Sequence, residues 1–337
     1  MIEQLPFSLP LFWSAVLAFS ILVYVLLDGF DLGVGILFAL NRNEAHRRQM
    51  MSSIAPVWDG NETWLIIVGT VLFGAFPVVY AIFLSAFYLP VALLLVALIL
   101  RGVAFEFRYK DERHRWLWDT GFILGSILAT FVQGAAIGAM VAGIPVEDGR
   151  FVGDPFDWLT PFPVLCGLGL VLGYALLGAG WLVLKTEGDL RDWAYTWLPR
   201  LMRGVMGFVA LALIATLIGD YQVVERWLAQ PWLFAFPLLA AAAARGLFRG
   251  VQARRDWQPW LMASALFLTA FAMLAGSFWP WLVPYHLTVE QAAAPAASLS
   301  FLFYGIGLVV LPVILIYTIT VYWIFRGKVS ADHSHDH

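Results

Sequence analysis

The chain alternates long apolar runs with short polar connections, a pattern typical of a protein that crosses a membrane many times. The first run, Leu9–Leu40, is broken only by two aspartates, and at 1.5 Å of helical rise per residue it exceeds a hydrocarbon core of about 30 Å. The uncharged stretch Thr63–Leu100 is long enough for two crossings, and the turn residues Gly74–Pro77 predict the hairpin between them. The pattern predicts an all-α membrane protein with nine transmembrane helices, at about residues 9–40, 53–76, 77–103, 118–143, 161–184, 205–222, 231–248, 259–281 and 301–325.

The nine predicted spans form one polytopic membrane domain, residues 1–328, followed by a flexible histidine-containing tail, residues 329–337. Composition agrees, because 61% of the residues are hydrophobic and 13% are charged, whereas a soluble protein carries about 25% charged residues. We expect no cleavable signal peptide, since the first apolar run is too long for the hydrophobic region of one. The single cysteine, Cys166, excludes an internal disulfide and a C-x-x-C-H haem attachment.

The basic residues predict how the chain is oriented. All but two of the 20 lysines and arginines lie in alternate connections or in the tail, and the exceptions are Arg150 and Arg226. Connections rich in lysine and arginine stay in the cytoplasm. We therefore predict a periplasmic N-terminus and a cytoplasmic C-terminus, which requires an odd number of spans. The outer connections, of which 144–160 and 282–299 are the longest, are too short to hold a soluble catalytic domain.

Three aspartates lie within the first two predicted spans. Asp28 and Asp31 are three residues apart, so both project from one face of the first predicted helix. Asp31 lies about 13 Å from the cytoplasmic end of that helix, and Asp59 lies about 9 Å into the second, which returns from the same side. A charged side chain inside a bilayer costs at least about 2.5–3.5 kcal/mol, so such residues usually face protein or water and serve a function. Carboxylates that open only towards the cytoplasm are typical of a proton uptake path.

The residues that follow Asp59 make an unusually polar entry to the second predicted span. The candidate proton-pathway residues are Asp28, Asp31, Asp59, Asn61, Glu62 and Trp64. A structural interpretation stays open, because the aspartates could pair with a buried arginine, for which Arg101 is the candidate, or cap a broken helix. Asn61 and Glu62 could equally face lipid headgroups or cap their helix.

The histidines limit the cofactors that this chain can hold. None of the six lies within a predicted span, so the chain alone lacks the buried axial ligand of an ordinary haem and any copper-type cluster. His333, His335 and His337 in the tail could chelate a divalent ion, although histidines in such a tail are more often solvated, and we expect no metal site. No P-loop, Rossmann fingerprint or nucleophile elbow stands in a strand–turn–helix context, and we expect no nucleic-acid partner.

Two motifs are specific enough to indicate a family: Asp28–Gly33, which reads DGFDLG, and Ser53–Leu65, which reads SIAPVWDGNETWL. Both resemble subunit II of the cytochrome bd-type quinol oxidases. Residues 119–258 match that family in hydropathy and length more than in motif, and the short outer loops resemble its cyanide-insensitive branch. The likeness spans the whole chain and continues through Gly74–Ala81, Phe87–Tyr88, Leu100–Arg108, Pro280–Pro284 and Leu315–Lys328.

The resemblance implies the non-haem subunit II of a terminal oxidase that couples quinol oxidation to the reduction of dioxygen to water and draws its protons from the cytoplasm. It implies a partner subunit I that holds the haems b and d, and a location in the bacterial inner membrane. It also implies two four-helix bundles plus one peripheral helix and, in some members, a small single-span third subunit or a structural quinone. Asp31 and Asp59 map onto the acidic residues of the family's proton channel, and Asp28, Asn61 and Trp64 fall in the same motifs.

Two other classes of protein are compatible with buried acids. A proton-coupled secondary transporter also places carboxylates near the middle of the membrane, but it needs access from both sides and is commonly built from internal repeats. The C-terminal half carries only Asp220 within a predicted span, near its outer end, so the sequence disfavours a transporter. A purely structural membrane anchor stays open if the aspartates are paired with arginines.

Overall fold

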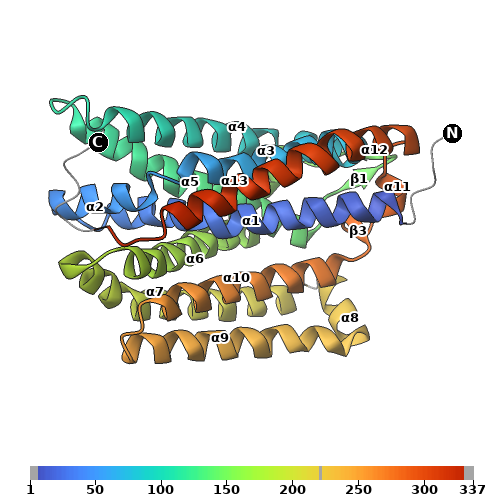
Figure 1. Ribbon diagram of the computed structural model, residues 1–337. Helices are drawn as coiled ribbons and strands as arrows, with labels where there is room; N and C mark the ends of the chain where they lie inside the picture. Colours follow the sequence, from blue (N-terminus) through green and yellow to red (C-terminus); the bar gives the residue numbers. More distant parts are fainter. Residues whose placement is uncertain (1–6, 220–221, 330–337) are drawn as a thin grey trace.

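The computed structural model describes residues 7–219 and 222–329, most of them in long helices that lie side by side (Figure 1). Asp220 and the three tail histidines fall outside this range. Eight helical segments of the described chain are long and apolar enough to cross a membrane: Leu9–Phe38, Pro77–Phe107, Arg115–Ala142, Pro161–Lys185, Gly188–Ile218, Pro231–Gln252, Trp257–Phe278 and Ala296–Ile324. The chain is therefore a multi-pass, mostly helical membrane protein, as predicted.

The long helices follow one another with short elements between them. The helices that run along the molecule are α1 (Leu9–Phe38), α3 (Trp58–Ala75), α4 (Pro77–Phe107), α5 (Arg115–Ala142), α6 (Pro161–Lys185), α7 (Gly188–Ile218), α9 (Ala235–Gln252) and α10 (Trp257–Phe278). The last runs as α12 (Ala296–Leu302), the π-helical segment η3 (Phe303–Val310) and α13 (Leu311–Ile324). The short helices are α2 (Glu44–Ile54), α8 (Gln222–Ala229), α11 (Val289–Ala292) and the 3-10 turns η1 (Asp157–Leu159) and η2 (Pro231–Phe234). Two antiparallel hairpins pair β1 (Val146–Glu147) with β2 (Arg150–Phe151) and β3 (Trp281–Val283) with β4 (Leu287–Thr288).

α1 lies between the other helices and packs against α3, α5 and α6. Its N-terminus is capped by Ser8, whose hydroxyl accepts a hydrogen bond from the amide of Leu11 at 3.4 Å. Each of its last eleven residues, 28–38, is buried. Gly33 allows α1 and α6 to cross closely, because a Cβ there would overlap the carbonyl oxygen of Tyr174 and lie 2.9 Å from the amide nitrogen of Gly178. Both aspartates of α1 therefore lie in this buried C-terminal segment.

The connection predicted after the first span contains a helix, and the second long helix begins later than predicted. Asn43 caps α2, because its side chain accepts hydrogen bonds from two amides of the first turn. Pro56 follows α2 and cannot continue it, so α3 begins at Trp58 rather than at Ser53. Asp59 consequently lies in the first turn of α3 and not about 9 Å inside a helix.

Other predicted boundaries also differ from the observed ones. α7 begins at Gly188 rather than near residue 205, and α5 begins at Arg115 rather than at Trp118. The basic residues at these positions lower the local hydropathy, but the helices continue through them. α9 begins at Ala235, after a 3-10 turn, and α4 bends near Pro90, where Phe87 leaves the helical conformation. Hydropathy therefore located the apolar part of each helix and not its ends.

The connections gather at two ends of the molecule (Figure 1). We call one the basic end: it holds residues 39–57, 108–114, 186–187, 253–256 and 325–329, with α2 among them. The other, the hairpin end, holds the two β-hairpins, α8 and α11. α1 begins at the hairpin end, and α13 finishes at the basic end. Two buried apolar clusters lie along α1, one around Trp181 towards the basic end and one around Trp13 and Trp64 towards the hairpin end.

Candidate functional site

Asp28 forms an ion pair with Arg101 in the interior of the helix bundle. Arg101 Nη1 donates to Asp28 Oδ1 at 2.8 Å, and neither side chain is more than 1% exposed. The same nitrogen lies 3.3 Å from Glu62 Oε1. Three helices assemble this cluster, because Asp28 comes from α1, Glu62 from α3 and Arg101 from α4. Within the described chain, Asp28 Oδ2 and the Nε and Nη2 atoms of Arg101 have no hydrogen-bond partner.

Asp31, one turn further along α1, has a neutral partner. Its Oδ2 accepts a hydrogen bond from Asn61 Nδ2 at 2.7 Å, and Asn61 Oδ1 accepts one from the Tyr322 hydroxyl at 3.0 Å. Asp31 is fully buried, and Asn61 is 1% exposed. No lysine, arginine or histidine among the described residues forms an ion pair with Asp31, and its Oδ1 has no hydrogen-bond partner there. An amide, and not a cation, therefore holds this carboxyl group.

A third set of polar side chains lies on α1 and its neighbours, towards the hairpin end. Tyr24 precedes Asp28 by one turn, and its hydroxyl accepts a hydrogen bond from Gln133 Nε2 at 3.0 Å. Gln133 Oε1 accepts in turn from the hydroxyl of Tyr174 at 3.2 Å. The two tyrosines are buried, and α5 and α6 supply Gln133 and Tyr174. Neutral groups thus continue the polar interior beyond the ion pair.

Asp59 and Trp64 do not join this interior cluster. The side chain of Asp59 is exposed on the first turn of α3. Trp64 is fully buried with its ring edge-on to Phe19 at 5.7 Å between centroids, and its indole nitrogen has no partner in the described chain. Glu62 is less exposed than Asp59 and less buried than Trp64, because its side chain is 23% exposed. Of the predicted site residues, the structure brings together Asp28, Asp31, Asn61, Glu62 and Arg101.

The buried polar atoms of this cluster are suited to hold water. Asp28, Asp31 and Glu62 each have one carboxylate oxygen without a hydrogen-bond partner in the described chain, and Arg101 has two such nitrogens. Buried polar groups are nearly always hydrogen-bonded, either to protein or to ordered water. These atoms provide the polar lining that internal water needs, and carboxyl groups linked by water can pass protons.

Sequence analysis did not identify Tyr322, Tyr24, Gln133 or Tyr174. Tyr24 could have been found, because it precedes Asp28 by four residues and therefore lies on the same helical face. Tyr322 lies in an apolar run, and its partner Asn61 is far away in the sequence. A single tyrosine in such a run gives no signal of the direction in which its hydroxyl points.

The described part of the chain contains no group of three or more His, Cys, Asp or Glu side chains that could hold a metal ion. His46 lies on α2, where its Nδ1 is 3.1 Å from Asn41 Nδ2 and where burial lowers the pKa of its imidazole. His114 lies in the connection 108–114 of the basic end, with its Nδ1 3.0 Å from Asp111 Oδ2. Cys166 is a free cysteine within α6.

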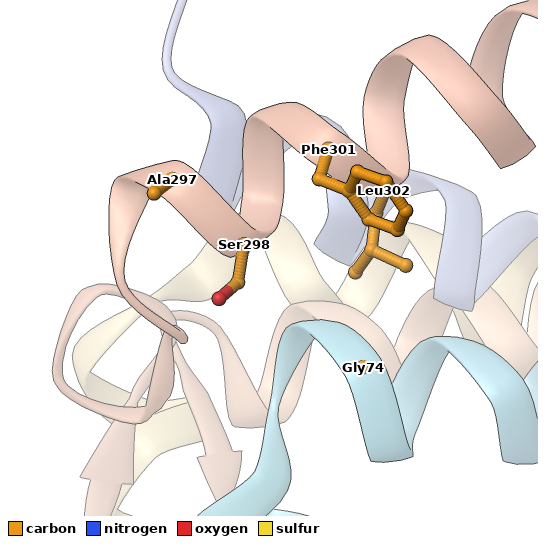
Figure 2. A pocket seen from close by; sticks show the side chains of 5 residues that line it. All are labelled: Gly74, Ala297, Ser298, Phe301 and Leu302. Atoms are coloured by element: carbon orange, nitrogen blue, oxygen red, sulfur yellow. The ribbon is translucent and has the colours of Figure 1, made fainter.

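An open hollow lies at the hairpin end, between α3 and α12 (Figure 2). Gly74 of α3 and Ala297, Ser298, Phe301 and Leu302 line it. Phe301 is 78% exposed, and Ser298 supplies the one side-chain hydroxyl among these residues. The hollow is separated from the buried carboxyl groups by most of the length of α3, so it takes no part in their chemistry.

Comparison with known proteins gives one consistent family. The family model for cytochrome bd terminal oxidase subunit II matches residues 9–325. The chain is 32% identical over 362 residues to cytochrome bd-I ubiquinol oxidase subunit 2 of Escherichia coli strain K12, with 95% of each chain covered. It is 30% identical over 331 residues to cytochrome bd ubiquinol oxidase subunit 2 of Bacillus subtilis strain 168, covering 94% of this chain and 96% of the relative. Its fold is similar to that of a chain of the bd oxidase from Geobacillus thermodenitrificans, with a TM-score of 0.73 and 18% identity over 95% of this chain and 99% of the other.

Proposed function

Since this chain belongs to the cytochrome bd terminal oxidase subunit II family, we propose that it is the non-haem subunit of a quinol oxidase and lines the path by which cytoplasmic protons reach its partner. Its relatives are subunits of ubiquinol oxidase, an oxidoreductase complex. The complex couples oxidation of quinol to reduction of dioxygen to water, with the haems b and d in subunit I. This chain contributes a scaffold and a proton route rather than a complete active site.

The observation that supports a proton route best is the contrast between Asp28 and Asp31. Asp28 is committed to an ion pair with Arg101, with Nη1 and Oδ1 2.8 Å apart. Asp31 is equally buried, yet it is held by a neutral amide and has one oxygen free of protein partners in the described chain. A carboxyl group in that setting can gain and lose a proton without breaking an ion pair. Asp31 is therefore the proton-carrying group, and the ion pair Asp28–Arg101 lies beside it.

Glu62 and Asp59 form the entrance of the proposed route. Glu62 is partly exposed and lies beside Arg101, so it connects the surface of the bundle with the buried pair. Asp59 is exposed on the first turn of α3, at the basic end. Beyond Asp28, towards the hairpin end, the described polar groups on this face are the neutral chain that starts at Tyr24. Among the described residues of this interior route, carboxylates thus lie only on the side from which cytoplasmic protons arrive.

In the membrane, we propose that α3 adds a ninth crossing to the eight. α3 lacks the long apolar stretch of the eight because its first turns carry Asp59, Asn61 and Glu62, but Asn61 and Glu62 contact Asp31 and Arg101 instead of lipid. Nine crossings put the N-terminus in the periplasm and the C-terminus in the cytoplasm, in agreement with the basic end. The helices then divide into two four-helix bundles and one peripheral helix, in the bacterial inner membrane, as the family resemblance implies.

The exposed face of α3 is the surface that we assign to the haem-bearing subunit I. Asp59, Ile66 and Phe73 are seven residues apart, so they form one stripe along the helix. Ile66 and Phe73 are 69% and 66% exposed, and Trp323 on the neighbouring α13 is 64% exposed. A partner on this stripe lies against the helix that carries Asn61 and Glu62, next to the buried carboxyl groups of the route. In family members with a small single-span third subunit, that subunit needs a different surface.

A structural quinone does not fit the hollow of Figure 2. A quinone ring needs enclosing apolar walls and donors for both of its carbonyl oxygens. The hollow is open, and Ser298 is the one side-chain donor among the residues that line it. No step of the proposed function is therefore assigned to a quinone bound by this chain.

The structure gives little support to the two alternative classes, a proton-coupled transporter and a structural membrane anchor. For a transporter, Asp28, Asp31 and Glu62 would need an opening towards the hairpin end, where the described buried side chains beyond Tyr24 are neutral or apolar. The structural-anchor interpretation accounts for Asp28, whose carboxylate is paired, but not for the unpaired Asp31.

The proposal is tested with Asp31→Asn and Asp59→Asn in the purified complex of both subunits. Because each change removes a titratable carboxyl group from the route, we expect quinol-driven oxygen consumption to slow by about 10²-fold while the haem spectrum persists. The control is Glu147→Gln, an exposed carboxylate at the hairpin end. Full turnover of both aspartate variants would contradict the proton route, and a purified complex without haem absorption would contradict the oxidase assignment.

A further inference from the structure

The Tyr322 hydroxyl is the one described group besides Asp31 that hydrogen-bonds to the side-chain amide of Asn61. It donates to Asn61 Oδ1 at 3.0 Å, and the other end of the amide, Nδ2, donates to Asp31 Oδ2 at 2.7 Å. A side-chain amide has one acceptor atom and one donor atom at its tip. As long as Tyr322 occupies the acceptor, only an N–H can face Asp31.

We infer that Tyr322 is a positioning residue of the proton route: acting through Asn61, it biases the exchange of the proton at Asp31 by deciding which end of the amide faces the carboxyl group. This inference rests on the proposed function, in which Asp31 carries the proton. A carboxylate can accept a hydrogen bond from N–H, whereas a protonated carboxyl group also needs an acceptor for its O–H. With the amide held as it is, the hydrogen bond from its N–H favours the carboxylate. With the amide reversed, its oxygen would face Asp31 and favour the protonated form.

Tyr322 is held in place by an aromatic stack that begins next to Asp31. Its ring lies edge-on to Trp181, with centroids 6.2 Å apart and planes at 75°. Trp181 stacks on Phe30 at 3.9 Å and 16°, and its indole nitrogen donates to the carbonyl oxygen of Ser53 at 3.2 Å. Phe30 directly precedes Asp31, so the stack ties the hydroxyl of Tyr322 to the backbone that carries the carboxyl group.

The segment after α13 anchors the helix end that carries Tyr322. Lys185, the last residue of α6, donates to the carbonyl oxygens of Phe325 and Gly327, and its own carbonyl oxygen accepts from the amide of Val329 at 2.7 Å. Lys328 Nζ lies 2.5 Å from Asp256 Oδ2. We call residues 325–329 the C-terminal clasp. It fixes α13 against α6 within one turn of Tyr322.

Four titratable or charged side chains face Asp31 from the elements packed around it. They are Asp28 on α1, Glu62 on α3, Arg101 on α4 and Tyr322 on α13. Three of these exert their influence through charge, and Tyr322→Phe leaves all three charges unchanged. A shift in the pH dependence of this variant therefore reports on the amide and not on the surrounding charges.

The test compares Tyr322→Phe with Tyr317→Phe in the complete oxidase. Tyr317 lies on the same helix, is 52% exposed and has no hydrogen bond from its hydroxyl in the described chain. Tyr322→Phe removes only the hydroxyl and frees the amide to reverse, so we expect the pH midpoint of oxygen consumption to move upwards by about one unit. The infrared band of the protonated Asp31 carboxyl group, identified by its loss in Asp31→Asn, should persist to correspondingly higher pH. Tyr317→Phe should leave both measurements unchanged.

A double variant locates the effect. Because Tyr322 acts through Asn61, Tyr322→Phe should cause no further shift when Asn61→Ala is already present. If Asp31→Asn impairs turnover but Tyr322→Phe behaves like Tyr317→Phe in both measurements, the inference is wrong and the proton route stands. A uniform loss of rate with an unmoved midpoint and an unmoved infrared band also overturns it, since it would mean a merely structural role. If Asp31→Asn itself leaves turnover unchanged, the proposed function fails instead.

Discussion

Asp28 and Asp31 demonstrate how two identical residues on one helical turn acquire different chemistry. Both are fully buried, but Asp28 contacts the guanidinium of Arg101 and Asp31 contacts the amide of Asn61. A cation strongly favours the ionised form of a carboxyl group over the protonated form, whereas a neutral amide favours it less. The difference in partner therefore separates a carboxyl group that is held in an ion pair from one that can exchange a proton without breaking such a pair.

Removing Arg101 should destabilise the protein more than removing an exposed arginine. In Arg101→Gln, Asp28 stays buried without its counter-charge, and breaking a buried pair in this way costs about 3–5 kcal/mol. The matched control is Arg249→Gln, since Arg249 is exposed and forms no ion pair within the described chain. Thermal unfolding of the complex, followed through its haem absorbance, measures the difference. Equal unfolding temperatures for the two variants would mean that the pair contributes nothing to stability.

At the scale of elements, apolar patterning predicted the long helices well and their ends poorly. Hydropathy averages over a window, so it missed α2, which is polar and begins at a cap supplied by Asn43. The same averaging placed the start of α3 too early and Asp59 too deep. The capping signal was present in the sequence, because Asn43 is followed by Glu44 in the first turn. Local hydrogen bonding, and not hydropathy, decides where these helices begin.

α2 is held to the bundle by an ion cluster centred on Glu44. Arg108 Nη2 lies 2.8 Å from Glu44 Oε2, and Arg108 Nε lies 2.5 Å from Asp119 Oδ1. Arg48 and Arg115 add longer contacts to Glu44, at 3.3 Å and 3.5 Å. Partial burial by itself would raise the pKa of Glu44, but these arginines outweigh it and hold the pKa below its ordinary value.

This lowered pKa predicts a pH-dependent contribution of Glu44 to stability. A carboxyl group whose pKa is lower in the folded chain stabilises it above the unfolded pKa of about 4.3, and that contribution is lost as the pH falls through the folded pKa. The unfolding temperature of Glu44→Gln should therefore lie below that of the wild type at neutral pH and approach it below about pH 4. Glu112→Gln is the control, since Glu112 is 81% exposed and contacts only Arg115. A gap that stays constant with pH would contradict the assigned role.

The crossing of α1 and α6 should not tolerate a side chain. Gly33→Ala would drive a methyl group into the carbonyl of Tyr174, and overpacking of this kind costs about 1–3 kcal/mol. Gly69→Ala in α3 is the matched control, because a Cβ there meets nothing within 4 Å and alanine favours a helix. The yield of assembled, haem-containing complex compares the two. Gly33→Ala complexes as abundant as those of Gly69→Ala would mean that the crossing is looser than the structure indicates.

At the scale of the whole molecule, the sequence predicted the membrane class, most of the long helices and the basic end. It also named five residues that the structure brings together, because family motifs and buried charge both point to them. Which aspartate Arg101 contacts depends on how α4 packs against α1, and hydrophobic periodicity contains no such information. The same holds for Tyr322, which reaches Asn61 only when the last helix returns beside α3.

We propose that protons taken up from the basic end reach the haem-bearing subunit through Asp31. The most direct measurement is the kinetics of proton uptake by the complete complex in lipid vesicles, with a pH-sensitive dye confined to the side of the basic end. Oxygen is mixed with the reduced complex, and wild type is compared with Asp31→Asn and with the Glu147→Gln control. We expect Asp31→Asn to slow proton uptake on that side as much as it slows turnover, and Glu147→Gln to change neither. Proton uptake at the wild-type rate in Asp31→Asn would contradict the proposal.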